Sequence, residues 1–166
     1  IDITCQQILA DRVLGAMAGV LGRRDDAAGL AAEADRLTAI VNDKMWNEST
    51  RFYADRFRDG SLSDVKSVGS YWALLADAVP EGRLDAFLSH LSDERAFNRP
   101  HRVPSLSADH PDYDPGGGYW RGAVWAPTTY MVLRGLTHVR RDALAHAIAR
   151  NHLDNVVAVF GSQGTL

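Results

Sequence analysis

Cysteine is almost absent from this sequence, and long apolar runs and clusters of basic residues are missing from it. Cys5 is the only cysteine among the 166 residues, so the chain has no internal disulfide and no zinc site built from several thiolates. No apolar stretch approaches the roughly 20 residues that span a bilayer, and we expect no membrane association. The formal net charge is -3, with Lys and Arg scattered along the chain, which argues against a nucleic-acid partner. These absences fit a reducing compartment, and we expect a cytoplasmic location.

The first residues, Ile1 to Thr4, show neither an initiating methionine nor the basic-then-apolar layout of a signal peptide. We therefore expect the chain to begin inside a longer polypeptide. Its length is typical of one domain, and its 46% of hydrophobic residues is enough for a sizeable core. Residues 1–166 are accordingly predicted to form a single, partial domain.

Apolar residues recur at helical spacing over most of the chain. Two series with spacings of three and four predict two helices that pair as an antiparallel hairpin. The first series is Leu9, Val13, Met17 and Val20, and the second is Leu30, Ala34, Leu37, Val41 and Met45. Further helices are expected at residues 70–78, 83–91, 127–136 and 142–160, with an extended connection at 46–55 and a long loop at 92–118. The pattern predicts an all-α fold of helical hairpins, in which the isolated Trp46 and Trp72 are core residues.

Flat aromatic side chains are concentrated in residues 116–127, which we call the aromatic loop. Its glycines lead into Tyr119, Trp120, Arg121 and Trp125, and an apolar helical pattern follows. Aromatic rings offer stacking area to the C–H faces of a sugar, and a guanidinium adds hydrogen-bond donors in a fixed fork. Glycine lets the backbone approach a ligand closely. We therefore predict that this loop binds a small carbohydrate.

The acidic residues contain no evident catalytic pair. Three of them share the proline-rich segment before the aromatic residues: Asp109, Asp112 and Asp114. An acid and a base need different environments, and one solvated loop offers no such contrast, so turn or capping roles are predicted here. Asp2 is predicted to cap the first helix, and Asp55 to form an ion pair with Arg56.

The remaining reactive residues also lack the spacing of known sites. None of the six histidines shows the spacing of a zinc hydrolase, and His146 and His152 fall on different sides of one helix. No serine stands in a Gly-x-Ser-x-Gly elbow. The glycines at 116–118 are not followed by the Lys-Ser/Thr of a phosphate loop. We expect no metal and no cofactor.

With these residues in view, the chain resembles a clan of inverting α-glycosidases that fold as (α/α)6 toroids. This clan includes trehalases, the family sixty-three glucosidases and the mannosylglycerate hydrolases. Five residues match a Tyr-Trp-Arg-Gly-x-x-Trp element that enters the sugar pocket of the mannosylglycerate-hydrolase-like domain: Tyr119, Trp120, Arg121, Gly122 and Trp125. Residues 1–4, 45–55, 103–107 and 126–136 resemble other segments of that family.

The resemblance implies a hydrolase of α-glycosidic bonds in small glucosides, mannosides or disaccharides, acting with inversion. The five matched residues are then implied to bind the substrate. For Arg121 the implied role is to bind a hydroxyl or carboxylate or to orient the base, and the alternative is that it holds its own loop in place.

The resemblance implies that the two catalytic carboxylates of the family lie outside this chain. By the resemblance, the general acid is an aspartate shortly before Ile1, and the general base is a glutamate shortly after Leu166. The predicted helices correspond to about half of a toroid, and the remainder of the same toroid is the expected partner. We expect the isolated chain to be inactive and poorly stable, because the inner faces of its helices lack partners.

Two other functions fit the same residues. One is a carbohydrate-binding helical module that does not hydrolyse its ligand. The other is a helical-repeat scaffold that binds a protein, although such scaffolds distribute contacts along a concave surface rather than in one loop.

Overall fold

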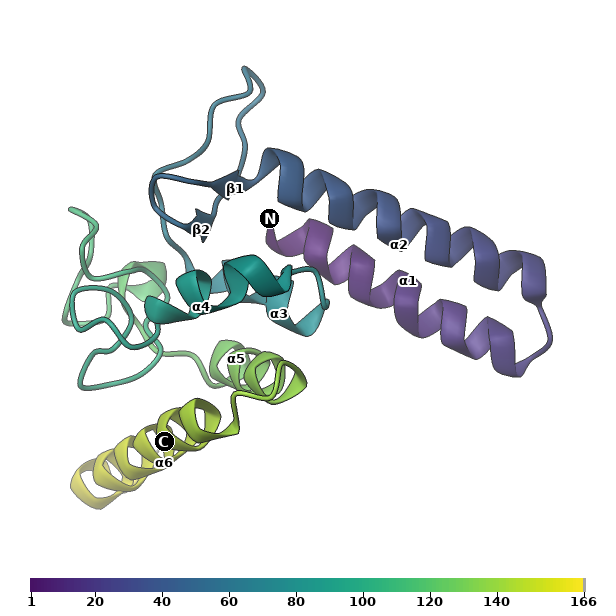
Figure 1. Ribbon diagram of the computed structural model, residues 1–166. Helices are drawn as coiled ribbons and strands as arrows, with labels where there is room; N and C mark the ends of the chain where they lie inside the picture. The colour runs from purple at the N-terminus through teal and green to yellow at the C-terminus, as the bar shows by residue number, and fades with distance from the viewer. Residues whose placement is uncertain (166) are drawn as a thin grey trace.

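The computed structural model describes residues 1–165 and is built mainly from α-helices (Figure 1). The helices are α1 (Asp2–Val20), α2 (Arg24–Lys44), α3 (Trp72–Leu75), α4 (Glu81–Ser89), α5 (Ala126–His138) and α6 (Asp142–Gln163). Two short strands, β1 (Trp46–Asn47) and β2 (Phe52–Tyr53), and two 3₁₀ turns, η1 (Val68–Tyr71) and η2 (Tyr119–Arg121), complete the elements of the described residues. This content confirms the all-α prediction.

The helices are arranged as hairpins with the long loops gathered at one side. Helices α1 and α2 form an antiparallel hairpin that projects away from these loops, and α5 and α6 form another at the C-terminal end (Figure 1). Strands β1 and β2 pair in antiparallel fashion, which confirms the extended connection after α2. Pro80 occupies the N-cap position of α4, and Pro127 lies in the first turn of α5, where a missing N–H costs nothing.

Most of the apolar series predicted for the first helix is exposed, and of its four residues only Leu9 packs against the core. Val13, Met17 and Val20 are 51%, 56% and 89% exposed. The side chains that α1 buries are Cys5, Ile8, Asp11 and Ala18. Gly15 lies on the side of α1 that contacts α2, where an added Cβ would lie 3.6 Å from the Cβ of Leu30, an ordinary van der Waals distance.

The cap role predicted for Asp2 is wrong, and Asp55 forms an ion pair as predicted but not with Arg56. Asp2 is the first residue of α1, the N-cap position belongs to Ile1, and the Asp2 carboxylate accepts the next backbone N–H at 2.7 Å. An acidic side chain in the first turn is favourable because the helix dipole is positive there. Asp55 accepts a hydrogen bond from the amino group of Ile1 at 2.5 Å. Arg56 instead donates to a backbone carbonyl of its own loop at 3.1 Å.

Aromatic rings fill the core between the strands, η1 and α4. Phe87 of α4 stacks on Tyr71 with ring centroids 4.8 Å apart and meets Tyr53 edge-on at 5.1 Å. Trp46 is 7% exposed and packs edge-on against Tyr53, and Trp72 packs half-buried against the same core. The prediction that these two tryptophans are core residues is confirmed.

Helices α3 and α5 touch at Gly135. A Cβ at this position would lie 2.8 Å from the Cβ of Leu74 and 3.3 Å from the backbone nitrogen of Leu75. Neither atom belongs to the end of a flexible side chain, so a larger residue would push the helices apart. Glycine therefore sets the distance between α5, which follows the aromatic loop, and the core.

We predict that Gly135→Ala lowers the free energy of unfolding by about 1–3 kcal/mol, the usual cost of overpacking. Urea denaturation of the full-length protein measures it. Gly29→Ala is the matched control, because a Cβ at this exposed position of α2 meets nothing within 4 Å. That control is expected to stabilise the protein by about 0.5–1 kcal/mol, since alanine favours helix over glycine. Equal stability of Gly135→Ala and wild type would contradict the close approach of α3 and α5.

Candidate functional site

Two segments that are distant in sequence, residues 66–68 and residues 104–107, lie side by side next to the aromatic loop. The backbone N–H of Val68, in η1, donates to the carbonyl of Ser105 at 3.0 Å, and the N–H of Ser105 donates to the carbonyl of Ala123 at 2.9 Å. The N–H of Ser107 donates to the carbonyl of Lys66 at 3.0 Å. Residues 104–107 therefore connect η1, which is part of the core, to the aromatic loop.

The backbone of the aromatic loop needs its glycines. Gly117 and Gly118 have φ angles of 109° and 44°, and the following Tyr119 also has a positive φ, 59°. A Cβ at Gly122 would lie 2.3 Å from the carbonyl oxygen of Asp114. Because a backbone oxygen cannot rotate away, only glycine permits this approach. The loop thus folds back on itself and turns its aromatic residues outward.

Three aromatic rings form one cluster on the loop. Trp120 and Trp125 stack with centroids 5.6 Å apart and planes 25° apart, and Tyr119 meets Trp125 edge-on at 5.3 Å. Tyr119 is 70% exposed and Trp120 is 49% exposed, whereas Trp125 is half-buried. The indole Nε1 of Trp125 is buried and has no hydrogen-bond partner among the described residues. The arrangement leaves two rings open to a ligand, with Trp125 packed against both.

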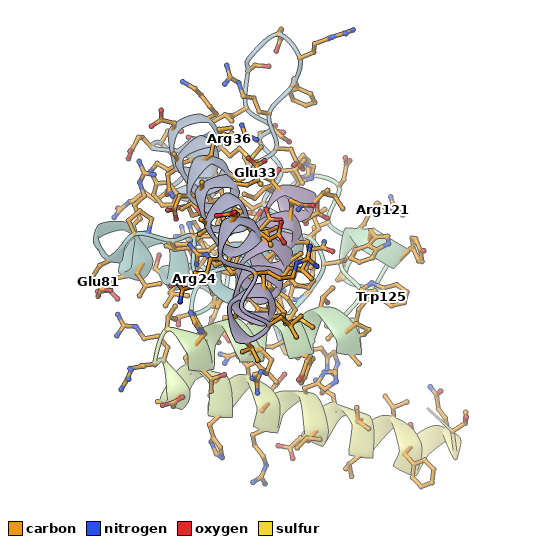
Figure 2. All side chains as sticks on the ribbon, turned by 90° about the vertical axis from the view of Figure 1, so that its right-hand side faces the viewer. Arg24, Glu33, Arg36, Glu81, Arg121 and Trp125 are labelled. Carbon is orange, nitrogen blue, oxygen red and sulfur yellow. The ribbon has the colours of Figure 1, made fainter. Side chains whose placement is uncertain are left out.

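Arg121 lies beside this cluster and pairs within its own loop. Figure 2 shows Arg121 and Trp125 together at one edge of the molecule, opposite Glu81. The guanidinium lies 3.7 Å from the carboxylate of Asp114 and is 61% exposed. Such an exposed pair contributes little stability. Most of the Arg121 side chain remains open to solvent. The other carboxylate oxygen of Asp114 accepts the N–H of Gly116 at 2.8 Å, as predicted for a turn residue.

The other two aspartates of this region also have partners in the loops. Asp109 pairs with Lys66 and accepts the Ser107 hydroxyl at 2.7 Å. Partial burial alone would raise the pKa of Asp109, but the hydrogen bonds from Lys66 and Ser107 outweigh it and hold this pKa below its usual value. The N–H of Asp112 donates to Nδ1 of His110 at 3.1 Å, which is a turn contact. Among residues 1–165 no three His, Cys, Asp or Glu side chains gather as metal ligands would.

A cavity of about 620 Å³ lies on the α6 side of the aromatic loop. Its walls are the glycine backbone of the loop, the residues around Pro100 and one face of α6. The basic side chains of its lining are Arg99, His101 and His152. Tyr119, Trp120 and Trp125 do not line it. The loop therefore has two different faces, one aromatic and exposed, the other against this cavity.

Sequence reasoning did not identify Ser105 as a functional residue. Its hydroxyl is buried, accepts the N–H of Gly122 at 3.0 Å and reaches the carbonyl of Tyr119 at 3.4 Å. Only the resemblance of residues 103–107 to a family segment pointed to this region. The hydrogen bonds join positions 14 and 17 residues apart, a distance over which local spacing gives no signal.

The helical hairpins and the glycine-rich loop define an all-α domain with an exposed aromatic surface, and comparison with known proteins gives its family. Residues 1–160 match the family model of the mannosylglycerate hydrolase MGH1-like glycoside hydrolase domain. The chain therefore belongs to this family of glycoside hydrolases.

Curated relatives share this domain at low identity. A probable mannosyl-oligosaccharide glucosidase of Schizosaccharomyces pombe is 25% identical over 82% of this chain and 18% of its own length. The mannosylglycerate hydrolase of Rubrobacter radiotolerans is 26% identical over 85% of this chain and 33% of its own length. An uncharacterized protein of Borreliella burgdorferi is 22% identical over 92% of this chain and 32% of its own length. The chain thus spans a third or less of the length of these relatives.

Solved structures show the same fold. The GH63 mannosylglycerate hydrolase of Thermus thermophilus superposes with a TM-score of 0.82 at 24% identity, over 98% of this chain and 37% of that chain. The neutral trehalase Nth1 of Saccharomyces cerevisiae gives a TM-score of 0.71 at 15% identity, over 84% of this chain and 26% of that chain. The chain has the fold of part of an (α/α)6 toroid, which confirms the predicted fold class. No helix within residues 1–165 is long and apolar enough to cross a membrane.

We predict that Gly122→Ala displaces the aromatic loop, because its Cβ would collide with the carbonyl of Asp114. The near-ultraviolet circular dichroism of the full-length protein should lose the contribution of the stacked Trp120 and Trp125. The free energy of unfolding should fall by about 1–3 kcal/mol. Gly161→Ala is the control, since a Cβ there meets nothing within 4 Å. Identical spectra for Gly122→Ala and wild type would show that the loop does not need glycine at this position.

Proposed function

We propose that this chain supplies one aromatic wall of the sugar pocket in an enzyme that hydrolyses α-glycosidic bonds of small glucosides, mannosides or disaccharides. The observation that carries the proposal is the pair of exposed rings, Tyr119 and Trp120, held against Trp125 at the start of α5. Membership of the glycoside hydrolase family supports it. So do the activities for which two relatives are named, a mannosylglycerate hydrolase and a probable mannosyl-oligosaccharide glucosidase.

The proposed roles follow from what each side chain exposes. Tyr119 and Trp120 offer their free surface to the C–H face of a sugar ring. Trp125 packs against both rings and restricts their movement. Arg121 directs a mostly exposed guanidinium to a substrate hydroxyl or carboxylate, for which its planar fork is suited. Gly122 allows the loop to fold tightly enough to present all of them.

The general acid and general base are proposed to come from outside residues 1–166. Of the aspartates near the aromatic loop, Asp109 and Asp114 are already paired with Lys66 and Arg121. The curated relatives are at least about three times longer than the matched segment, which leaves room for the catalytic groups. An inverting enzyme holds its two carboxyl groups roughly 6.5–9.5 Å apart, with a water opposite the leaving group. By itself this chain is expected to be inactive.

The remainder of the toroid is the proposed partner of two apolar surfaces. On α1, Val13, Met17 and Val20 are exposed, as described above. On α6, Val157 and Phe160 are 69% and 56% exposed. Large apolar side chains in rows on a helix surface are typical of faces that another element covers. The partial coverage of every relative described here supports this assignment.

Tyr119→Ala in the full-length protein is predicted to reduce kcat/KM for small α-glycosides, such as mannosylglycerate, by about tenfold or more, equivalent to roughly 1.4 kcal/mol. The loss should appear mainly in KM if the ring contacts ground state and transition state alike. Tyr130→Ala is the matched control, because Tyr130 is 64% exposed but lies on α5 outside the aromatic loop. Equal kinetics for the two variants would count against the sugar-binding wall.

Inversion predicts that an α-glycoside first releases the β-anomer of the sugar, because water attacks from the face opposite the leaving group. Proton NMR of the full-length protein with substrate, recorded before mutarotation, distinguishes the two anomers. Release of the α-anomer would show retention and would rule out a single-step displacement by water. Substrate binding without any hydrolysis would instead indicate a carbohydrate-binding module.

A further inference from the structure

The turn that carries the aromatic rings is short and has only a few backbone hydrogen bonds of its own. Element η2 contains three residues, and a 3₁₀ turn has poorer hydrogen-bond geometry than an α-helix. It is entered through Gly118 and Tyr119, both at positive φ, a region that a tyrosine side chain disfavours. Contacts from outside the turn therefore contribute to the orientation of Tyr119 and Trp120.

Ser105 provides such a contact at both ends of η2. Its hydroxyl accepts the N–H of Gly122, just after the turn, at 3.0 Å. The same hydroxyl donates a longer hydrogen bond to the carbonyl of Tyr119, the first residue of the turn, at 3.4 Å. The Gly122 N–H is shared with the Tyr119 carbonyl inside η2. The Ser105 hydroxyl thus bonds both Tyr119, the first residue of the turn, and Gly122, the residue after the turn.

The backbone of Ser105 connects this closure to the core. Its N–H donates to the carbonyl of Ala123 at 2.9 Å, and its carbonyl accepts the N–H of Val68 at 3.0 Å. Val68 is fully buried in η1, and Ser105 itself is only 2% exposed. Because Ser105 is buried, water does not compete for its hydrogen bonds. A displacement of Ser105 would therefore move the aromatic loop relative to the core.

We propose that Ser105 is a positioning residue, whose buried hydroxyl sets the orientation of Tyr119 and Trp120 toward the sugar. This inference rests on the proposed function, because it assigns the rings to substrate binding. It extends that function by naming a residue that touches no substrate and acts through the Tyr119–Gly122 turn. Ser105→Ala removes both side-chain hydrogen bonds with little change in volume.

The test uses the full-length protein labelled with 5-fluorotryptophan. In ¹⁹F NMR, Ser105→Ala is expected to shift or broaden the resonances of Trp120 and Trp125, assigned with Trp120→Phe and Trp125→Phe. The resonances of Trp46 and Trp72 in the core should stay in place. With small α-glycosides, KM is expected to rise by about tenfold while kcat stays close to wild type. A variant that was merely less folded would instead lose kcat at constant KM, since fewer molecules would be active.

Ser107→Ala is the matched control, because Ser107 is equally buried two residues away but its hydroxyl donates to Asp109. It should leave the Trp120 and Trp125 resonances and KM unchanged. Ser105→Cys, which keeps the size but bonds weakly, replaces Ser105→Ala if that variant does not fold.

Unchanged Trp120 and Trp125 resonances together with an unchanged KM in the Ser105 variants would overturn the positioning role. A separate outcome concerns the proposed function. If Tyr119→Ala leaves hydrolysis intact while Ser105→Ala still shifts the ¹⁹F resonances, then Ser105 orders the loop but the loop is not the sugar-binding wall.

Discussion

The position of the aromatic loop depends on the hydrogen bonds of residues 104–107. On one side these residues bond to η1 in the core, and on the other side they bond to the aromatic loop. Residues 92–118 contain no helix or strand, so they cannot hold a precise position through local structure. The N–H and carbonyl of Ser105 join Ala123 to Val68, and its hydroxyl closes the turn that carries the rings. Through η1 and the buried Tyr71, this contact reaches the aromatic core.

The helices and the general place of the site were predictable because their signals are local. Spacings of three and four residues predicted the hairpins, and Pro127 stands at the predicted start of the helix that became α5. The orientation of α1 was not predictable, because periodicity shows that a face is apolar but not which surface covers it. The contact between Gly15 and α2 is a property of two helices together. The role of Ser105 was missed for the same reason, since its partners are far away in sequence.

The structure also refines the predicted ligand site. The sequence placed Trp120 and Trp125 in equivalent roles, yet Trp120 is half-exposed while Trp125 packs against its face and against the edge of Tyr119. Arg121 is paired with Asp114 but remains open. The glycine backbone of the same loop lines a cavity beside α6 that contains none of these aromatic rings. A sugar on the aromatic face and a ligand in that cavity would therefore contact different atoms of one loop.

The most direct test of the account is a crystal structure of the full-length protein with a small α-glycoside, trapped by removing the catalytic base. The account predicts a sugar ring lying against Tyr119 and Trp120, with Arg121 near a hydroxyl or carboxylate. Trp125 should contact the other two rings rather than the open face of the sugar. A substrate bound in the cavity between the aromatic loop and α6, with the exposed rings free, would contradict it.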